Sequence, residues 1–175
     1  MKSKAIILLK NKLDKSPQGF IDPDIIPLLN IINKKYTTTS SCSGRITLMR
    51  GVKKGEAQWL YKTHTKASAK KVYAIIQKEG TLRFLYEPLI LHFQCQDKEQ
   101  AEKVLQTLQT NGFKRSYLVS FKHWTIEIND TGRIETLVTK ELSKKYMTLL
   151  VKEANKRLKK TKENIEKLEK LFLLF

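Results

Sequence analysis

The stretch Tyr36-Thr37-Thr38-Thr39-Ser40-Ser41-Cys42-Ser43-Gly44-Arg45 divides the 175-residue chain into a helical beginning and a strand-rich middle. Its first four residues are aromatic or β-branched, which favours an extended strand. The small residues that follow are typical of a loop whose backbone N–H groups approach a polar ligand, and Arg45 adds a two-pronged donor for a carboxylate or phosphate. The alternative interpretation is an ordinary polar turn between strands.

Two helices are predicted before this stretch. Lys4–Leu13 carries apolar residues at helical spacing, and the turn Ser16–Gly19 ends it. Asp22 is then a plausible N-cap, with Pro23 at the first helical position of a second helix. That second helix is apolar nearly all round, up to Ile32, so we expect it to be buried.

Two similar sets of elements are predicted after the stretch. The first is a hairpin, Ile46–Arg50 and Ala57–Thr63 around the turn Gly51–Gly55, followed by a helix at Ser68–Glu79. The second comprises a strand at Leu89–Gln94, a helix from the N-cap Asp97 to Asn111, and strands at Lys114–Phe121, Trp124–Ile128 and Ile134–Val138. Across these elements runs a faint internal repeat: a helix, the segment Tyr36–Ile46 and a hairpin are matched by a helix, the segment Phe113–Ser120 and two more strands. The period of this repeat is near eighty residues, too long for a solenoid. The sequence therefore predicts an α+β fold in one domain, 1–175, whose two related α/β halves (roughly 20–80 and 85–140) share a mixed sheet flanked by helices.

A long helix is predicted at about 142–172. Its apolar residues recur every seven positions and form an a/d seam over more than three heptads. One row is Val151, Leu158, Ile165 and Phe172, and the other is Met147, Ala154, Thr161, Leu168 and Phe175. We expect this seam to pack within its own monomer along the sheet. A dimeric coiled coil is the alternative.

The net charge of +17, from 34 Lys and Arg against 17 Asp and Glu, is the strongest compositional signal. An excess of this size is typical of proteins that bind nucleic acid. Lysine-rich solvated faces are the alternative, because only six of these cations are arginine. The paired lysines Lys53 with Lys54 and Lys159 with Lys160 are the candidate phosphate contacts.

Several classes of protein are excluded by what the sequence lacks. There is no run of eighteen apolar residues and no small-residue cleavage site near the N-terminus, which argues against a membrane span and a secretory signal. Two cysteines exclude a disulfide framework and indicate a reduced, cytoplasmic protein. A Gly-rich dinucleotide motif, a phosphate-binding loop and metal-ligand spacing are also missing, so no metal site is predicted.

Four further side chains are candidates for chemistry, each with a structural alternative. His64 stands at the end of a predicted strand and His92 within one; a hydrogen-bonded histidine in the core or at an edge is the alternative for both. Glu87 directly precedes Pro88, where capping or ion pairing is the simpler reading. Arg133 could grip an anion or form a surface salt bridge.

These motifs together resemble the wybutosine-synthesising tRNA methyltransferase family. The stretch from Tyr36 to Arg45 is similar to the signature of that family, and supporting matches follow in family order over about residues 20–160. The supporting matches are Trp59…His64, Glu87–His92, Gly112–Lys114 with Ser116, and Glu127-Ile128 with Thr131 and Arg133. The chain departs from the family pattern at Lys122-His123-Trp124, where more aliphatic residues are expected, and in its short turn at Gly51–Gly55.

The resemblance implies a fold without a Rossmann cofactor site. It also implies methyl transfer from S-adenosylmethionine to N4 of 4-demethylwyosine, or of its aminocarboxypropyl derivative, next to the anticodon of phenylalanine tRNA. The implied partner is the anticodon stem–loop. On this reading His64 and Glu87 are the catalytic candidates, and the candidates for binding cofactor or substrate are Ser40, Ser41, Ser43, Gly44, Arg45, Trp59, His92 and Arg133.

Three other functions stay open on the sequence alone. A non-catalytic RNA-binding module would bind tRNA but not S-adenosylmethionine. A ribonuclease using His64 and His92 would cleave RNA without a cofactor. An assembly protein would depend on the heptad seam and show neither activity.

Overall fold

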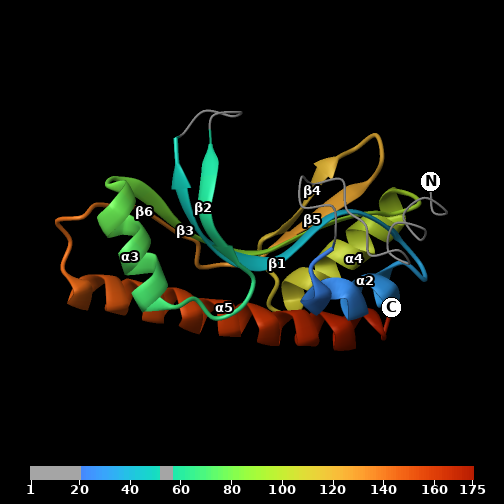
Figure 1. Ribbon diagram of the computed structural model, residues 1–175. Coiled ribbons are helices and arrows are strands. Elements are labelled where there is room, and N and C mark those ends of the chain that lie inside the picture. The colour runs from blue at the N-terminus through green and yellow to red at the C-terminus, as the bar shows by residue number, and fades with distance from the viewer. Residues whose placement is uncertain (1–20, 52–56) are drawn as a thin grey trace. The chain divides into compact units, whose positions relative to one another are not determined.

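The computed structural model describes residues 21–51 and 57–175, which form six strands, a long C-terminal helix and several shorter helices (Figure 1). In chain order the elements are η1 (Pro23–Ile25), α2 (Ile26–Ile32), β1 (Thr37–Arg50), β2 (Gln58–Thr63), α3 (Ala69–Glu79), β3 (Leu82–Gln94), α4 (Lys98–Thr110), β4 (Ser116–Ser120), β5 (Thr125–Asn129), β6 (Ile134–Val138) and α5 (Lys144–Phe172). The predicted α+β class and long C-terminal helix are confirmed. The helix predicted at Lys4–Leu13 and the pair Lys53 and Lys54 lie outside the described residues.

The strands form one sheet in the order β2-β1-β3-β5-β4, and β6 also pairs with β3. A mixed sheet was expected, but the β1–β2, β3–β5, β3–β6 and β4–β5 pairs are all antiparallel. Short connections explain two of these pairs, β1–β2 and β4–β5, because neighbouring strands joined by a hairpin must run in opposite directions.

The chain divides into two compact units. Among the described residues, unit 1 contains 21–43, Leu89–Thr131 and Lys162–Phe175, and unit 2 contains Gly44–Pro88 and Gly132–Thr161. Each unit has its own hydrophobic core: α2, α4 and β5 contribute to the core of unit 1, whereas α3 and β2 contribute to that of unit 2. The internal duplication at roughly 20–80 and 85–140 stays a prediction.

The predicted loop at Ser40–Arg45 is wrong, because these residues lie inside β1. Gly44 allows the strand to continue, since its φ of +88° is a conformation that L side chains rarely adopt. A Cβ at this position would also lie 3.1 Å from the Thr161 side chain. Small polar residues have weak strand propensity, so pairing with neighbouring strands, rather than local composition, makes this segment extended.

β3 is longer than predicted and begins at Leu82, so Glu87 and Pro88 are strand residues. Proline cannot donate to a strand ladder. Here it falls between two ladders: Leu82–Tyr86 pairs with β6, whereas Ile90–Gln94 pairs with β5. The missing N–H of Pro88 therefore lies where β3 changes partners.

The heptad seam of α5 is buried within the chain, as predicted. Met147, Val151, Ala154 and Leu158 belong to the core of unit 2, and Ile165, Leu168 and Phe172 belong to that of unit 1. Each of these seven residues is at most 5% exposed. The seam thus supplies core packing in both units.

We expect Ile165→Ala to lower the free energy of unfolding by about 2–4 kcal/mol, because the substitution leaves a cavity around a side chain that is 2% exposed. Leu149→Ala is the matched control on the same helix, since Leu149 is 63% exposed, and it should change stability by no more than about 0.5 kcal/mol. Thermal unfolding at several protein concentrations gives both values. A melting temperature that rises with concentration would instead show that an oligomer interface contributes to stability.

Candidate functional site

Unit 2 brings together Gly44, Arg45, Trp59, Lys62, His64 and Glu87, which we call the Arg45 cluster. Arg45 is on β1 and Glu87 is on β3, forty-two positions apart in the sequence. Arg45 Nε donates to Glu87 Oε2 at 2.5 Å, and both side chains are 27% exposed. The pair is therefore held in a fixed orientation while it remains accessible to a ligand.

The indole of Trp59, on β2, lies under two cations. Arg45 Cζ is 4.7 Å from the Trp59 ring centroid and Lys62 Nζ is 4.6 Å from it. Both distances are within the range of cation–π attraction. Since Trp59 is 43% exposed, the cluster presents an aromatic surface next to two positive charges.

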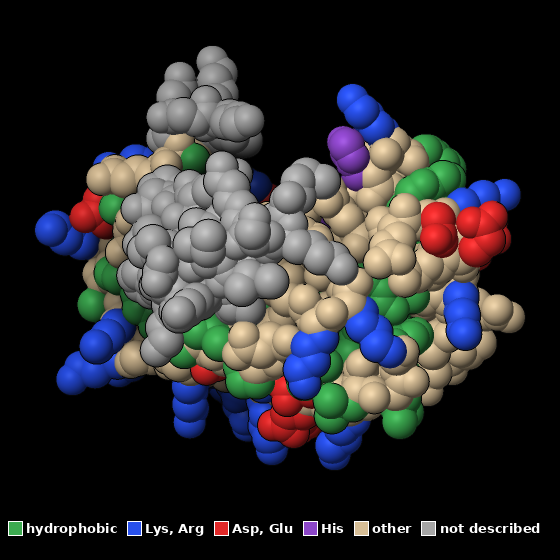
Figure 2. All heavy atoms as spheres, turned by 90° about the vertical axis from the view of Figure 1, so that its right-hand side faces the viewer, with side chains coloured by type: hydrophobic (Ala, Val, Ile, Leu, Met, Phe, Trp, Pro, Cys, Tyr) green, Lys and Arg blue, Asp and Glu red, His purple; other side chains and the backbone are tan. Residues whose placement is uncertain are grey.

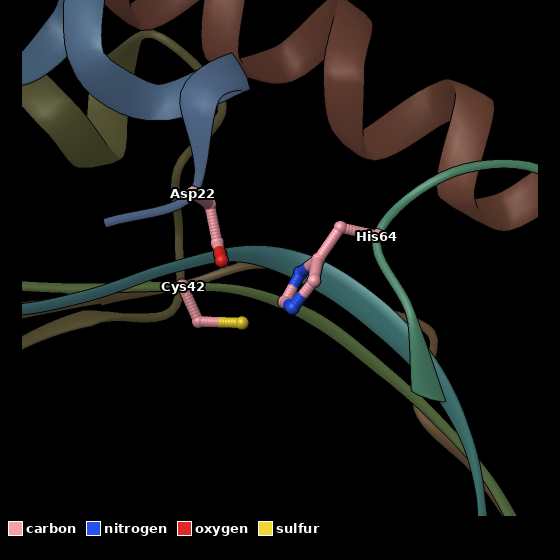
Figure 3. A group of neighbouring side chains, drawn as sticks. All are labelled: Asp22, Cys42 and His64. Carbon is pink, nitrogen blue, oxygen red and sulfur yellow. The ribbon is translucent and has the colours of Figure 1, made fainter. Parts of the chain in front are cut away.

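His64 follows β2, and its ring is held by the backbone of β1 (Figure 3). Its Nδ1 lies 2.9 Å from the carbonyl oxygen of Gly44. A carbonyl oxygen only accepts hydrogen bonds, so Nδ1 carries the proton, and in the neutral ring Nε2 is the proton-accepting nitrogen. Gly44 thus sets the tautomer of His64 in addition to shaping β1.

The Arg45 cluster has the groups needed to recognise a flat anionic ligand. The guanidinium and the Lys62 ammonium suit a carboxylate or phosphate. The Trp59 ring suits stacking by a planar heterocycle. The cluster can therefore bind and orient such a ligand beside the His64 imidazole, whose Nε2 is buried.

Ser43 and Asp22 belong to a polar network in unit 1. Asp22 is the N-cap residue of η1, as predicted, with Pro23 at the start of that helix, but its side chain makes no cap hydrogen bond: Oδ2 accepts from Ser43 N at 2.9 Å instead. Lys162 Nζ donates to the carbonyl and hydroxyl oxygens of Ser43 and pairs with Asp24 at 2.8 Å. The Asp22 carboxylate and the thiol of Cys42 lie within 4.8 Å of each other (Figure 3). Ser43 is fully buried, so its polar groups must find hydrogen-bond partners inside the protein, and this network supplies them.

The other two serines of β1, Ser40 and Ser41, differ in burial. Ser40 is exposed and Ser41 is half-buried. Of the three predicted serines, these two have the more accessible positions.

His92 belongs to a second polar group, in unit 1. The strand registers place His92 on β3 and Tyr117 on β4 directly opposite Glu127 on β5. His92 Nε2 and Tyr117 Oη both hydrogen-bond the Glu127 carboxylate. Burial raises the pKa of Glu127, but the hydrogen bonds from Tyr117 and His92 outweigh it and leave that pKa below its ordinary value. The same Tyr117–Glu127 bond raises the pKa of the Tyr117 phenol.

The remaining predicted residues lie at exposed positions. The Arg133 side chain is 55% exposed and donates to Glu135 at 2.8 Å, and Arg83 also bonds Glu135. Lys159 and Lys160 are exposed on α5. Arg133, Lys159 and Lys160 are therefore not members of the Arg45 cluster.

Sequence analysis missed Lys62, Tyr117 and Glu127 as members of these groups. Lys62 could have been identified from the strand register. It pairs with Thr47, and Thr47 lies two residues after Arg45, on the same face of β1. That register was hidden because Ser40–Arg45 reads locally as a loop. Tyr117 and Glu127 likewise meet only through the pairing of β4 with β5.

The chain is similar to known proteins over nearly its whole length. The family model described as Methyltransferase TYW3 matches residues 1–173. The tRNA(Phe) 7-((3-amino-3-carboxypropyl)-4-demethylwyosine(37)-N(4))-methyltransferase of Thermococcus sibiricus is 38% identical, over 96% of this chain and 90% of that protein. The tRNA wybutosine-synthesizing protein 3 homolog of Danio rerio is 32% identical, over 91% of this chain and 68% of that protein.

The solved structure of the PH1069 protein from Pyrococcus horikoshii is similar to this one, with a TM-score of 0.83 at 34% identity. The match covers 98% of this chain and 93% of that one. A protein from Aeropyrum pernix matches with a TM-score of 0.73 at 26% identity, over 86% of this chain and 96% of that one. Over residues 21–51 and 57–175, no helix has the length and apolar character to cross a membrane.

Proposed function

Because the chain belongs to the family described as Methyltransferase TYW3, we propose that it transfers a methyl group from S-adenosylmethionine to N4 of a 4-demethylwyosine-type base in phenylalanine tRNA. The names of relatives 34–38% identical over most of the chain support the reaction and the tRNA. The observation on this chain that supports it best is the Arg45 cluster, which joins an anion-binding pair, an exposed indole and an oriented imidazole.

The residues of the Arg45 cluster fit S-adenosylmethionine. Its amino-acid end carries a carboxylate, which suits the Arg45 guanidinium and Lys62, and its adenine is a flat ring that suits Trp59. When bound, S-adenosylmethionine supplies a methyl group already activated on sulfur. No metal or covalent residue is then needed, and the task left to the protein is positioning and proton removal.

Methylation at N4 replaces an N–H bond with an N–CH₃ bond, so one proton must leave the base. We assign its removal to Nε2 of His64, which the hydrogen bond to Gly44 leaves as the accepting nitrogen of the neutral ring. Glu87 is a positioning residue, because its carboxylate holds Arg45 Nε. The exposed Ser40 and Ser41, together with His92 and Arg133, are proposed substrate contacts outside the cluster.

The anticodon stem–loop of the tRNA is the proposed partner. The charge of +17 suits a phosphate backbone, and Lys159 with Lys160 on α5 offers two adjacent exposed ammonium groups in unit 2. Lys53 and Lys54 stay proposed phosphate contacts from the sequence alone.

A direct assay tests the proposed function. The protein is incubated with tritium-labelled S-adenosylmethionine and with phenylalanine tRNA that carries either 4-demethylwyosine or unmodified guanosine at the same position. Label should enter only the first tRNA, and calorimetry should detect binding of S-adenosylmethionine. Binding of tRNA without S-adenosylmethionine would favour an RNA-binding module, and cleavage of tRNA without a cofactor would favour a ribonuclease.

We expect Lys159→Ala with Lys160→Ala to weaken tRNA binding across all RNA sequences and to make the affinity less dependent on salt. Each lost phosphate contact lowers the slope of log affinity against log salt by about 0.7–0.9. Lys70→Ala with Lys71→Ala is the matched control, since these lysines are also adjacent and exposed, on α3. Fluorescence anisotropy over a salt series gives the slopes. Equal losses in both variants would contradict a phosphate contact specific to Lys159 and Lys160.

A further inference from the structure

The exposed side of the β4–β5 hairpin carries an aromatic and basic surface that the Arg45 cluster does not use. Tyr117, Val119 and Phe121 are 46%, 45% and 76% exposed, and a register shift between Leu118 and Ser120 reverses the alternation along β4, so Tyr117 and Phe121 lie on opposite faces of the hairpin. We call these three residues, with Lys122 and Trp124, the hairpin platform. β4 stands last in the strand order, so within residues 21–51 and 57–175 no further strand pairs with its outer edge.

Two aromatic rings of the hairpin platform are held in place by the structure. The Tyr117 hydroxyl donates to Glu127, which is 8% exposed and lies on the neighbouring strand. Phe121 contacts Trp124 edge to face, with centroids 6.3 Å apart and an interplanar angle of 77°. Trp124 in turn packs against the core of unit 1, and its carbonyl oxygen accepts from Cys95 N at 3.0 Å. Phe121 and Tyr117 are therefore exposed rings with little freedom left to lose on binding.

All the charged residues in the segment that carries these rings are basic. The segment from Phe113 to Trp124 contains Lys114, Arg115 and Lys122 and no acidic residue. All three cations are exposed, whereas the nearest carboxylate on β5, Glu127, is buried and bonded to Tyr117 and His92. Figure 2 shows one face of the molecule, on which a histidine and a basic side chain project near hydrophobic side chains, with acidic side chains beside these. A polyanion with exposed planar groups is the ligand that matches this combination.

We propose that the hairpin platform binds unpaired nucleotides of the RNA substrate by stacking them on Phe121, with Lys122 on the adjoining phosphate. Exposed aromatic rings flanked by cations are a general means by which proteins hold single-stranded RNA. Duplex RNA keeps its bases stacked inside, so it gains only the charge contacts. The proposal rests on the proposed function for the choice of RNA, and it adds a second contact region, in unit 1, to the Arg45 cluster of unit 2.

The test measures affinity for a fluorescein-labelled anticodon stem–loop RNA and for a fully paired RNA duplex of the same length. Phe121→Ala should weaken stem–loop binding at least about fivefold, the lower end of the known contribution of base stacking, without changing the salt slope. Binding of the duplex should change less than about twofold. Phe121→Trp should retain stem–loop affinity. Leu137→Ala, which removes a hydrophobic side chain 64% exposed on β6, is the matched control and should leave both affinities unchanged.

Each other outcome overturns the proposal. Equal weakening of duplex and stem–loop would mean that the hairpin contributes only to general affinity. Unchanged stem–loop binding by Phe121→Ala would exclude stacking at this site, and dissociation of a wild-type dimer by the same substitution would identify the platform as an interface between two copies. The methyl-transfer assay on the wild-type protein separates these results from a failure of the proposed function, because stem–loop binding is measured without any methyl donor.

Discussion

His64→Ala should lower the rate of methyl transfer at saturating substrates by about 10²–10⁴-fold, the usual contribution of a positioned general base. The effect is expected because the Gly44 carbonyl fixes the proton on Nδ1 and leaves Nε2 to accept one. Radiolabel transfer to the tRNA measures the rate. Added imidazole should restore part of the activity of His64→Ala, a result that a purely structural role for His64 would not give.

His64→Asn is the matched variant, since the asparagine amide can still donate to the Gly44 carbonyl but offers no basic nitrogen. It should fold as the wild type does, remain inactive and show no imidazole rescue. Activity of His64→Ala within about threefold of wild type would mean that the proton leaves directly to water.

The elements with local start and stop signals could be predicted from the sequence. Asp97 accepts from Gln100 N and opens α4, and Ser68 accepts from Lys71 N and opens α3, as capping by short polar side chains requires. Gly80, at φ +83°, ends α3. The seam of α5 was also readable, because a seven-residue repeat places one apolar face toward the core.

The elements that depend on distant partners could not be predicted in the same way. Ser40–Arg45 contains no run of β-branched residues, so only its place in the sheet makes it a strand. Pro88 reads as a break, yet β3 passes through it because its ladder partner changes there from β6 to β5. Both errors have one cause: strand pairing is a long-range interaction, and local propensity carries little of it.

The same limit applied to the candidate site. The sequence identified Arg45, Trp59, His64 and Glu87 one by one, through their residue types and a family resemblance, but not their contacts. The Arg45–Glu87 pair and the stacking of Arg45 on Trp59 depend on how β1 lies beside β2 and β3. Lys62 was missed because it is three positions from Trp59 on β2, a spacing that puts side chains on opposite faces of a regular strand. The register shift at Leu48/Met49, which lets both lie on one face, carries no local sequence signal.

Arg45→Lys should lower methyl transfer at least about tenfold at saturating tRNA. The Arg45 guanidinium donates to Glu87 through Nε and also lies over the Trp59 ring. These two contacts together fix the orientation of its planar group. A lysine ammonium can keep one of these contacts but cannot present two parallel N–H donors to a carboxylate. Loss of a charge-assisted hydrogen bond to the ligand corresponds to about 1.5–3 kcal/mol, or roughly ten- to a hundredfold.

The fold should tolerate this substitution, because partly exposed ion pairs contribute only about 0–1 kcal/mol to stability. Arg83→Lys is the matched control: Arg83 also lies in unit 2, is also paired with a glutamate, and has a side chain 22% exposed. Its activity should stay within about twofold of wild type. If Glu87 acts through Arg45, Glu87→Gln should add little to the defect of Arg45→Lys in the double variant, since both remove the same oriented fork. Full activity of a well-folded Arg45→Lys protein would leave Ser40–Arg45 as a structural part of β1 and move the ligand contact to Lys62.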